Sequence, residues 1–246
     1  MILVVTGTST GVGKTVATAA LAARARSRGA RRIAVVKPVQ TGVDEATPAD
    51  LADVQRLAGP VTAVECARFT DPLAPDVAAR RAGLPQPRRN DIAAAIADTA
   101  AAHDVTIVEG AGGVLVRLAE SGGDAGPLTI LDVAADAGAP VVVVASPALG
   151  TLNHTELTVA AIRARGLTPA GIVVGWWPAD PDLAMRCNAD DLARVTGVPV
   201  IGTLPEGVGG MAREEFLAAA PNWFDPDWVP PKTTTTDRRP DEGVRS

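Results

Sequence analysis

The segment Thr6–Thr15 constrains the possible folds of this chain more than any other stretch. It reads Thr-Gly-Thr-Ser-Thr-Gly-Val-Gly-Lys-Thr, follows the apolar run Ile2–Val5 and precedes an alanine-rich helical pattern. A strand, a glycine-rich loop and a helix in this order form a phosphate-binding loop, because backbone N–H groups and the positive helix end surround an anion. The pattern predicts that Lys14 contacts the terminal phosphates of a nucleotide and that the Thr15 hydroxyl binds Mg²⁺.

The loop is one residue longer than the common form of this motif. The common form has a glycine five residues before Gly13, whereas this chain has Thr8 there and a glycine one position earlier, at Gly7. The position of the loop and its flanking elements nevertheless agree with phosphate binding. We therefore prefer this interpretation to a glycine-rich turn that only caps a helix.

The scarcity of lysine indicates a second site residue. Of 23 basic residues only three are lysines, namely Lys14, Lys37 and Lys232. Since arginine serves here as the general surface cation, we expect Lys14 and Lys37 to be used for their compact ammonium groups, whereas Lys232 lies in a polar tail. Lys37 follows the buried strand predicted at Ile33–Val36, and Pro38 prevents a helix there. Lys37 should thus lie at the carboxyl edge of the sheet, where open α/β sheets bind ligands.

Three carboxylates are candidates for a metal site. Glu109 follows the predicted strand Val105–Val108 and precedes small residues, which is where phosphate-binding-loop enzymes carry an acidic metal ligand. Asp50 and Asp53 lie one turn apart on a short helix predicted at Pro48–Leu57. The two aspartates could both face a metal–phosphate site or both lie on a solvated helix face, and the spacing fits either arrangement.

Strand and helix patterns alternate along the chain. Strands are expected at Ile2–Val5, Ile33–Val36, Val105–Val108, Pro140–Ala145, Gly171–Val174 and Val200–Gly202. Helices are expected at Lys14–Arg28, Pro48–Leu57, 91–102 with Asn90 as N-cap, Leu128–Ala137, Thr151–Arg165 and 183–196. Residues 61–89 are proline-rich and aperiodic and are expected to form loops, and residues 119–127 have the composition of a lid.

This alternation predicts an α/β fold, with six or seven mostly parallel strands and helices on both faces of the sheet. We expect one domain over residues 1–229 and a disordered polar tail over residues 230–246. The net charge is −5, without a long basic run, so we expect no nucleic-acid partner. The sequence shows no signal peptide and no apolar run of membrane-spanning length, so we expect a cytoplasmic protein with no membrane partner.

Four motifs taken together resemble dethiobiotin synthetases. They are Thr6–Thr15, Lys37-Pro38-Val39-Gln40-Thr41-Gly42, Val108-Glu109-Gly110-Ala111-Gly112-Gly113 and Gly150-Thr151-Leu152-Asn153-His154. They occur in the order and spacing of that family, and the resemblance spans about residues 1–225. The resemblance implies a single-domain P-loop NTPase fold.

The implied activity is an ATP-dependent carboxylation in biotin synthesis. The substrate would be 7,8-diaminopelargonic acid, which carries two adjacent amines and a terminal carboxylate. One amine captures CO2 as a carbamate, the carbamate oxygen attacks the γ-phosphate, and the second amine closes a cyclic urea by attacking the carbamic–phosphoric anhydride. Such chemistry asks the protein mainly for positioning and charge neutralisation. The resemblance also implies ATP as co-substrate, Mg²⁺, and a homodimer with the substrate across the interface.

Residue roles follow by carry-over from the family. Lys14 and Lys37 would be catalytic, and Thr15, Asp50 and Glu109 would hold Mg²⁺. The nucleotide would contact Thr10, Gly11, Val12, Gly13, Lys14, Thr15, Asp50, Glu109, Gly112, Gly175, Trp176, Pro205, Glu206 and Gly207. The diamine would contact Thr10, Lys37, Thr41, Gly112 and Gly113 and, from the second subunit, Gly150, Thr151, Leu152 and Asn153.

The chain departs from the family at the nucleotide base. Many dethiobiotin synthetases place an amide-bearing pair such as Asn-Asp after the corresponding strand, where the amide hydrogen-bonds the edge of adenine. This chain has Gly175-Trp176-Trp177-Pro178 there and offers no amide. Stacking on a flat apolar ring tolerates any base, so we expect weak base selectivity.

Two other classes of protein share parts of this pattern. Partition and septum-positioning ATPases carry an early second lysine in Lys-Gly-Gly-Val-Gly-Lys-Thr, but this chain has Ser9 at that position. Cobyrinate amidating synthetases add a glutaminase domain with a Cys–His pair, and no Cys or His follows residue 210. A partition-type dimeric switch ATPase therefore remains the alternative function.

Overall fold

The computed structural model describes residues 1–44, 49–121 and 126–231 of the chain. Its main sheet has seven parallel strands in the order β4-β2-β6-β1-β7-β8-β9. These strands are β1 (Ile2–Gly7), β2 (Ile33–Lys37), β4 (Thr62–Glu65), β6 (Val105–Gly113), β7 (Val141–Ala145), β8 (Pro169–Trp177) and β9 (Val200–Pro205). A parallel pair, β3 (Gln40–Thr41) and β5 (Arg68–Phe69), stands apart from this sheet. The predicted α/β fold with a parallel sheet is confirmed.

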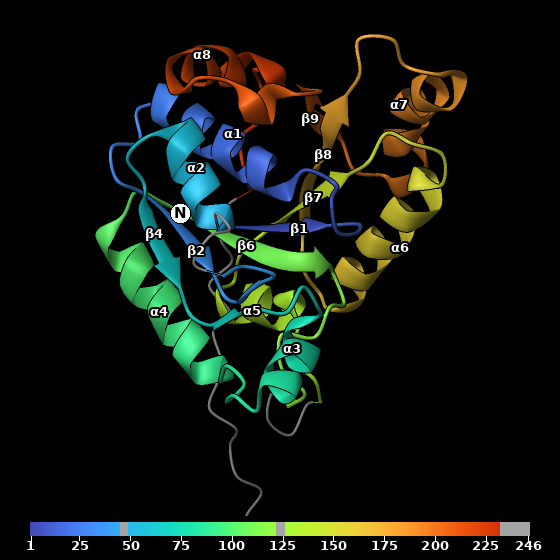
Figure 1. Cartoon of the computed structure of the whole chain (residues 1–246). Helices are drawn as coiled ribbons and strands as arrows, with labels where there is room; N and C mark the ends of the chain where they lie inside the picture. The colour runs from blue at the N-terminus through green and yellow to red at the C-terminus, as the bar shows by residue number, and fades with distance from the viewer. Residues whose placement is uncertain (45–48, 122–125, 232–246) are drawn as a thin grey trace, which may run out of the picture.

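Helices cover both faces of the sheet (Figure 1). They are α1 (Lys14–Ser27), α2 (Asp50–Ala58), α3 (Pro75–Ala82), α4 (Arg89–Ala102), α5 (Ile130–Asp136), α6 (Thr151–Ala164), α7 (Leu183–Thr196) and α8 (Arg213–Ala219). Two short 3₁₀ helices, η1 (Val208–Gly210) and η2 (Ala220–Trp223), flank α8. Helices α1, α2 and α8 pack on one face, and α3 to α6 pack on the other.

The strands form because valine-rich segments bury side chains in both layers. In the central strand β1, Val5 belongs to the core under α1 and α2, while its neighbour Val4 belongs to the opposite core. The same alternation runs through β7, whose five residues are all buried. Strands buried on both faces are typical of parallel sheets covered by helices.

Residues 61–89 do not form only loops, so that prediction was wrong. They contain β4, β5 and α3. Strand β4 lies at the edge of the sheet and its four residues are exposed or half-buried, so it lacks the apolar run that marked the other strands. Helix α3 starts at Pro75, and proline at the first helical position is a start signal that the composition of the segment obscured.

Other boundaries also differ from the predictions; α5 spans only Ile130–Asp136, for example, and β9 continues to Pro205. Arg88, not Asn90, is the N-cap residue of α4, and Asn90 lies in its first turn. Strands β6 and β8 continue beyond Val108 and Val174, because their neighbours β1 and β9 still supply register partners for Gly113 and Trp177. The segments Glu109–Gly113 and Gly175–Trp177, predicted as loops, are therefore strand.

A C-terminal segment closes the core under α1. The buried guanidinium of Arg24 donates hydrogen bonds to the carbonyls of Asp225 and Trp228, at 2.5 and 2.9 Å, and lies over the ring of Phe224. The Trp228 indole N–H donates to the carbonyl of Ala170 at 2.9 Å. These contacts attach the chain to the domain as far as Trp228. Residues 232–246, which make up most of the predicted tail, lie outside the described residues, as do residues 122–125 of the predicted lid.

Within the described ranges, no helix combines the length and the apolar character needed to cross a bilayer.

Candidate active site

A cavity of about 820 Å³ opens at the carboxyl edge of β1, β2 and β6. It gathers residues that the sequence had placed in five separate segments. The predicted site residues in its wall are Thr10, Gly11, Gly13, Lys14, Thr15, Lys37, Thr41, Asp50 and Gly112. Glu109 lies directly beneath this wall and contacts two of these residues. The cavity is large enough for a small ligand.

The glycines of the loop between β1 and α1 are required by its conformation. Gly11 and Gly13 have φ angles of 74° and 93°, which side-chain-bearing residues rarely adopt. Gly13 is also the N-cap residue of α1, so the loop leads directly into the helix N-terminus. This geometry presents backbone N–H groups and the positive end of the helix dipole to the cavity.

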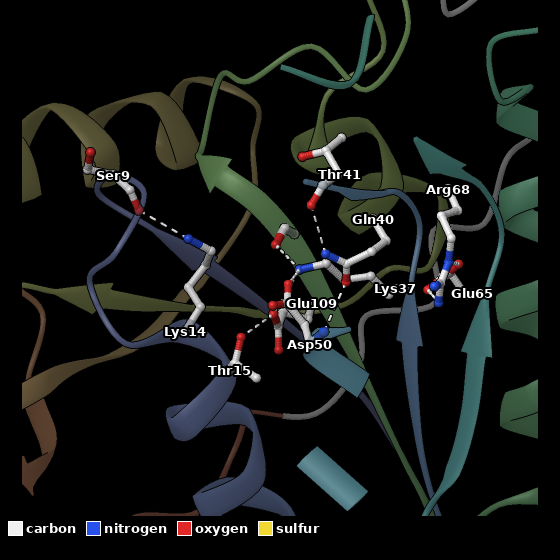
Figure 2. A network of polar contacts seen from close by, with 11 residues as sticks. Ser9, Lys14, Thr15, Lys37, Gln40, Thr41, Asp50, Glu65, Arg68 and Glu109 are labelled. Carbon is white, nitrogen blue, oxygen red and sulfur yellow. Dashed lines mark hydrogen bonds and ion pairs between the residues drawn. The ribbon is translucent and has the colours of Figure 1, made fainter. Parts of the chain in front are cut away.

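Lys14 is buried in the loop that it follows. Its Nζ donates a hydrogen bond to the carbonyl of Ser9 at 3.0 Å (Figure 2). Burial, together with the nearby positive charge of Lys37, lowers the pKa of Lys14 to about 8. A bound triphosphate would place negative charge beside this ammonium and raise its pKa again.

Nucleotide binding should therefore take up a proton above pH 8. In the free protein Lys14 is half neutral at pH 8, and only its ammonium form pairs with phosphate. The dissociation constant of the nucleotide should rise as the pH increases above 8, with a limiting slope of about tenfold per pH unit. Calorimetric titration at pH 8.5 in two buffers of different ionisation enthalpy measures the uptake directly. Titration near pH 7, where Lys14 is already charged, is the control, and equal heats at pH 8.5 in both buffers would contradict the expectation.

Lys37 holds a buried charge cluster together at the end of β2 (Figure 2). Its Nζ lies 2.8 Å from Oε1 of Glu109 and 2.6 Å from Oδ2 of Asp50. It also donates a hydrogen bond to the carbonyl of Gly110 at 3.1 Å. The side chain of Lys37 is only 3% exposed and that of Glu109 is fully buried, so both charges depend on these partners.

The pKa of Lys37 lies above its usual value. Burial alone would lower this pKa, but the charges of Glu109 and Asp50 and their hydrogen bonds outweigh the burial. Lys37 thus remains an ammonium ion throughout the neutral and moderately alkaline range. A fixed point charge at the cavity wall is suited to stabilise negative charge on a reacting group.

Glu109 has one oxygen engaged and one without a partner. Its Oε1 accepts hydrogen bonds from the Thr15 hydroxyl at 3.0 Å and from Lys37 at 2.8 Å. Its Oε2 is buried and has no hydrogen-bond partner among the described residues. A buried carboxylate oxygen next to a hydroxyl suits a hard cation, since Mg²⁺ prefers oxygen ligands. The described residues include no cluster of three His, Cys, Asp or Glu side chains, so phosphate oxygens or water would complete the coordination.

The structure separates the two aspartates of α2. Asp50 turns toward Lys37, whereas Asp53 pairs with Arg56 at 2.9 Å on the exposed face of the helix. Only Asp50 is placed to act at the cavity. Gln40, to which the sequence analysis gave no role, holds this arrangement, because its amide oxygen accepts a hydrogen bond from the Asp50 N–H at 3.1 Å. The sequence feature that could have indicated this role is the position of Gln40 in the motif that follows β2. The burial of Gln40 agrees with a side chain that points inward.

Several predicted site residues lie outside the wall of this cavity. Gly113 pairs with Gly7 at the end of β1, and Gly150 is the N-cap residue of α6 ahead of Thr151, Leu152 and Asn153. Gly175 and Trp176 belong to β8, and Pro205 ends β9 just before Glu206 and Gly207. Val12 is buried within the loop that precedes α1. The segment Gly150–Asn153 and the β8–β9 end are therefore not part of the wall that holds Lys37.

A family model described as AAA domain matches residues 2–208. The chain is 55% identical to the ATP-dependent dethiobiotin synthetase BioD of Rhodococcus jostii, over 96% of this chain and 98% of that protein. It is 51% identical to the protein of the same name from Streptomyces coelicolor, over 92% of both chains.

Solved structures with similar folds are more distant in sequence. A ParA family ATPase of Chlorobium tepidum superposes with a TM-score of 0.54 at 13% identity, over 89% of this chain and 88% of that chain. The septum site-determining protein MinD of Pyrococcus horikoshii gives a TM-score of 0.53 at 15% identity, over 89% and 93%. At these identities the likeness concerns the fold alone.

Proposed function

Because the chain belongs to the family of ATP-dependent dethiobiotin synthetases, we infer that it is an ATP-dependent ligase acting on 7,8-diaminopelargonic acid. It carboxylates this diamine with CO2 and closes the ring of dethiobiotin. The observation that carries this conclusion is 55% identity over nearly the full length of both chains. The resemblance found in the sequence is thereby confirmed, and the partition-type switch is not favoured.

The charge cluster supports a mechanism for the reaction. One amine of the substrate captures CO2 as a carbamate, and the carbamate oxygen attacks the γ-phosphate with release of ADP. The second amine then attacks the carbamic–phosphoric anhydride, expels phosphate and closes the cyclic urea. Lys37 carries its charge at the cavity wall and is suited to stabilise the carbamate and the transferring phosphoryl group. Lys14, at the helix N-terminus, is suited to hold the terminal phosphates.

Mg²⁺ is the metal that best suits the donor set. Thr15, Asp50 and Glu109 would hold it together with phosphate oxygens, and the unpartnered Oε2 of Glu109 supports this assignment. When bound, the ion neutralises charge on the phosphates. In this arrangement the ammonium of Lys37 offsets part of the negative charge of Glu109 and Asp50, because it lies within 2.8 Å of both carboxylates.

Asp50→Asn should raise the Mg²⁺ concentration needed for half-maximal activity by about tenfold or more. The substitution removes one carboxylate of the site and one partner of Lys37. Asp53→Asn is the matched control, because it makes the same change one turn away on α2, where Asp53 pairs with the half-exposed Arg56. Mg²⁺ titrations of both variants at saturating ATP compare them. Equal shifts in the two variants would contradict a metal-site role for Asp50.

We further propose a homodimer with the diamine across the interface. The distant carboxylate of the substrate needs an anion site, and the N-terminus of α6 offers the N–H groups of Leu152 and Asn153, whereas the Thr151 N–H already donates to the carbonyl of Ala148 at 3.1 Å. Leu149 and Leu157, just before α6 and on it, are 86% and 62% exposed, which supports an interface on this helix. The family assignment does not depend on this dimer, which stays a prediction. The cytoplasmic location expected from the sequence also stays a prediction.

Asn153→Asp should weaken diamine binding by about fivefold, the effect of about 1 kcal/mol of like-charge repulsion near water. Nucleotide binding should stay intact, because the phosphate-binding loop lies elsewhere. Steady-state KM values for both substrates separate the two effects, and sedimentation at assay concentration gives the oligomeric state. An equal loss of both affinities, or a fully active monomer, would rule out this assignment.

The proposed reaction is tested by phosphate release with ATP, Mg²⁺ and bicarbonate, with and without the diamine. The synthetase should release phosphate only when the diamine is present, whereas a switch ATPase would release it without the diamine.

Repeating the assay with GTP and CTP tests the weak base selectivity expected from Gly175 and Trp176. A loss of no more than about tenfold in kcat/KM, roughly 1.4 kcal/mol, is expected.

A further inference from the structure

The phosphate-binding loop rests on strand β8 at a single glycine. A Cβ atom added to Gly175 would lie 1.8 Å from the carbonyl oxygen of Val12, and 2.8 Å from Cγ1 of Val144. From the other side, a Cβ on Gly13 would lie 2.6 Å from the carbonyl oxygen of Gly175. The backbones of the loop and of β8 are therefore in direct contact, with no side chain between them.

The backbone conformation of Gly175 does not explain why it is glycine. Gly175 lies inside β8 and is not among the glycines with positive φ, so other residues could adopt its conformation. The close approach of the Val12 carbonyl, and to a smaller degree that of Val144, excludes a side chain there. Cβ contacts shorter than 3.0 Å essentially never occur, so any larger residue would force the loop and the strand apart by more than an ångström.

We propose that Gly175 is a positioning residue that sets the place of the phosphate-binding loop on the sheet. Val12 lies between the two glycines of positive φ, Gly11 and Gly13, and its carbonyl makes the closest approach of the loop to Gly175. A displacement of this carbonyl would move the backbone of Gly13 and Lys14 at the start of α1, and both residues line the cavity. The role of Gly175 is thus to hold these amides in place. This inference depends on the proposed use of the loop as the nucleotide site.

Gly175→Ala should raise the dissociation constant for ATP·Mg²⁺ by at least about tenfold. A misplacement of one ångström at a preorganised site can lower the rate of a catalysed reaction by about 100-fold. We expect a smaller loss in affinity, because the loop can partly relax around the added methyl group. Binding is measured directly by calorimetric titration without diamine. A failure of this proposal is thereby distinguishable from a failure of the proposed reaction, which the phosphate-release assay addresses.

Gly202→Ala is the matched control. Gly202 is also a buried strand glycine without positive φ, on the neighbouring strand β9. Its added Cβ would lie 2.6 Å from Cδ1 of Phe224, in the C-terminal segment and not in the loop. This variant should lose thermal stability, as Gly175→Ala also should, but its affinity for ATP·Mg²⁺ should stay within about twofold of the parent protein.

A background variant keeps the test decisive if Gly175→Ala alone does not fold. Val144→Ala removes the methyl group that an added Cβ would meet at 2.8 Å and leaves the Val12 carbonyl as the main conflict. The double variant, Val144→Ala with Gly175→Ala, is then compared with Val144→Ala alone. A loss of ATP·Mg²⁺ affinity confined to the variants with alanine at position 175 would support the positioning role. An unchanged affinity in the folded double variant, or an equal loss in Gly202→Ala, would overturn it.

Discussion

Replacing Lys37 with arginine should lower kcat by at least about 100-fold, the size of effect seen when one electrostatic stabiliser of a transition state is lost. The Nζ atom of Lys37 has two carboxylates and one carbonyl within 3.1 Å, and its side chain is 3% exposed. A guanidinium keeps the charge but spreads it over a larger planar group, which this enclosed position does not fit. The affinity for nucleotide should change little, because we expect the loop before α1 to make most of the contact with the nucleotide.

Single-turnover and steady-state assays of Lys37→Arg, together with ATP titration, separate these effects. Lys37→Met is the companion variant, because it removes the charge and keeps a long unbranched side chain. If the charge alone mattered, Lys37→Arg would retain far more activity than Lys37→Met. Retention of most activity in both variants would show that Lys37 takes no part in the reaction.

Glu109→Gln should have the larger effect, a loss of about 1,000-fold in kcat/KM, equivalent to about 4 kcal/mol. Breaking a buried ion pair by removing one partner costs about 3–5 kcal/mol, because the remaining charge is left buried. Here the substitution would leave Lys37 with Asp50 as its one carboxylate partner among the described residues and would remove a proposed ligand of Mg²⁺. The free energy of unfolding should fall as well, by about 3 kcal/mol.

Glu65→Gln is the matched control for that experiment. Glu65 also ends a strand at the same edge of the sheet, but it pairs with the half-exposed Arg68 at 2.7 Å (Figure 2). Its loss should change kcat/KM by less than about twofold. Denaturant unfolding of both variants separates the loss of stability from the loss of activity. A Glu109→Gln enzyme with nearly full activity at high Mg²⁺ would show that the carboxylate serves stability alone.

The sequence by itself determined the parallel α/β fold, the family and about half of the residues in the cavity wall. These features depend on local patterns: valine runs that form strands buried on both faces, and glycine-rich segments at strand ends. Because carboxyl ends of parallel strands meet at one edge, Lys14, Lys37 and Glu109 could be assigned to one site from their places in the chain. The edge strand β4 was missed for the same reason, since it lacks a buried apolar run.

Only the tertiary structure decided how individual side chains face one another. Asp50 and Asp53 have the same charge and lie on the same helix, and the packing of α2 against the sheet turns one toward Lys37 and the other toward solvent. The contact of Gly175 with Val12 joins residues 163 positions apart in the chain. Such choices depend on distances of a few ångströms between elements that are remote in sequence, and no local pattern of residues records them.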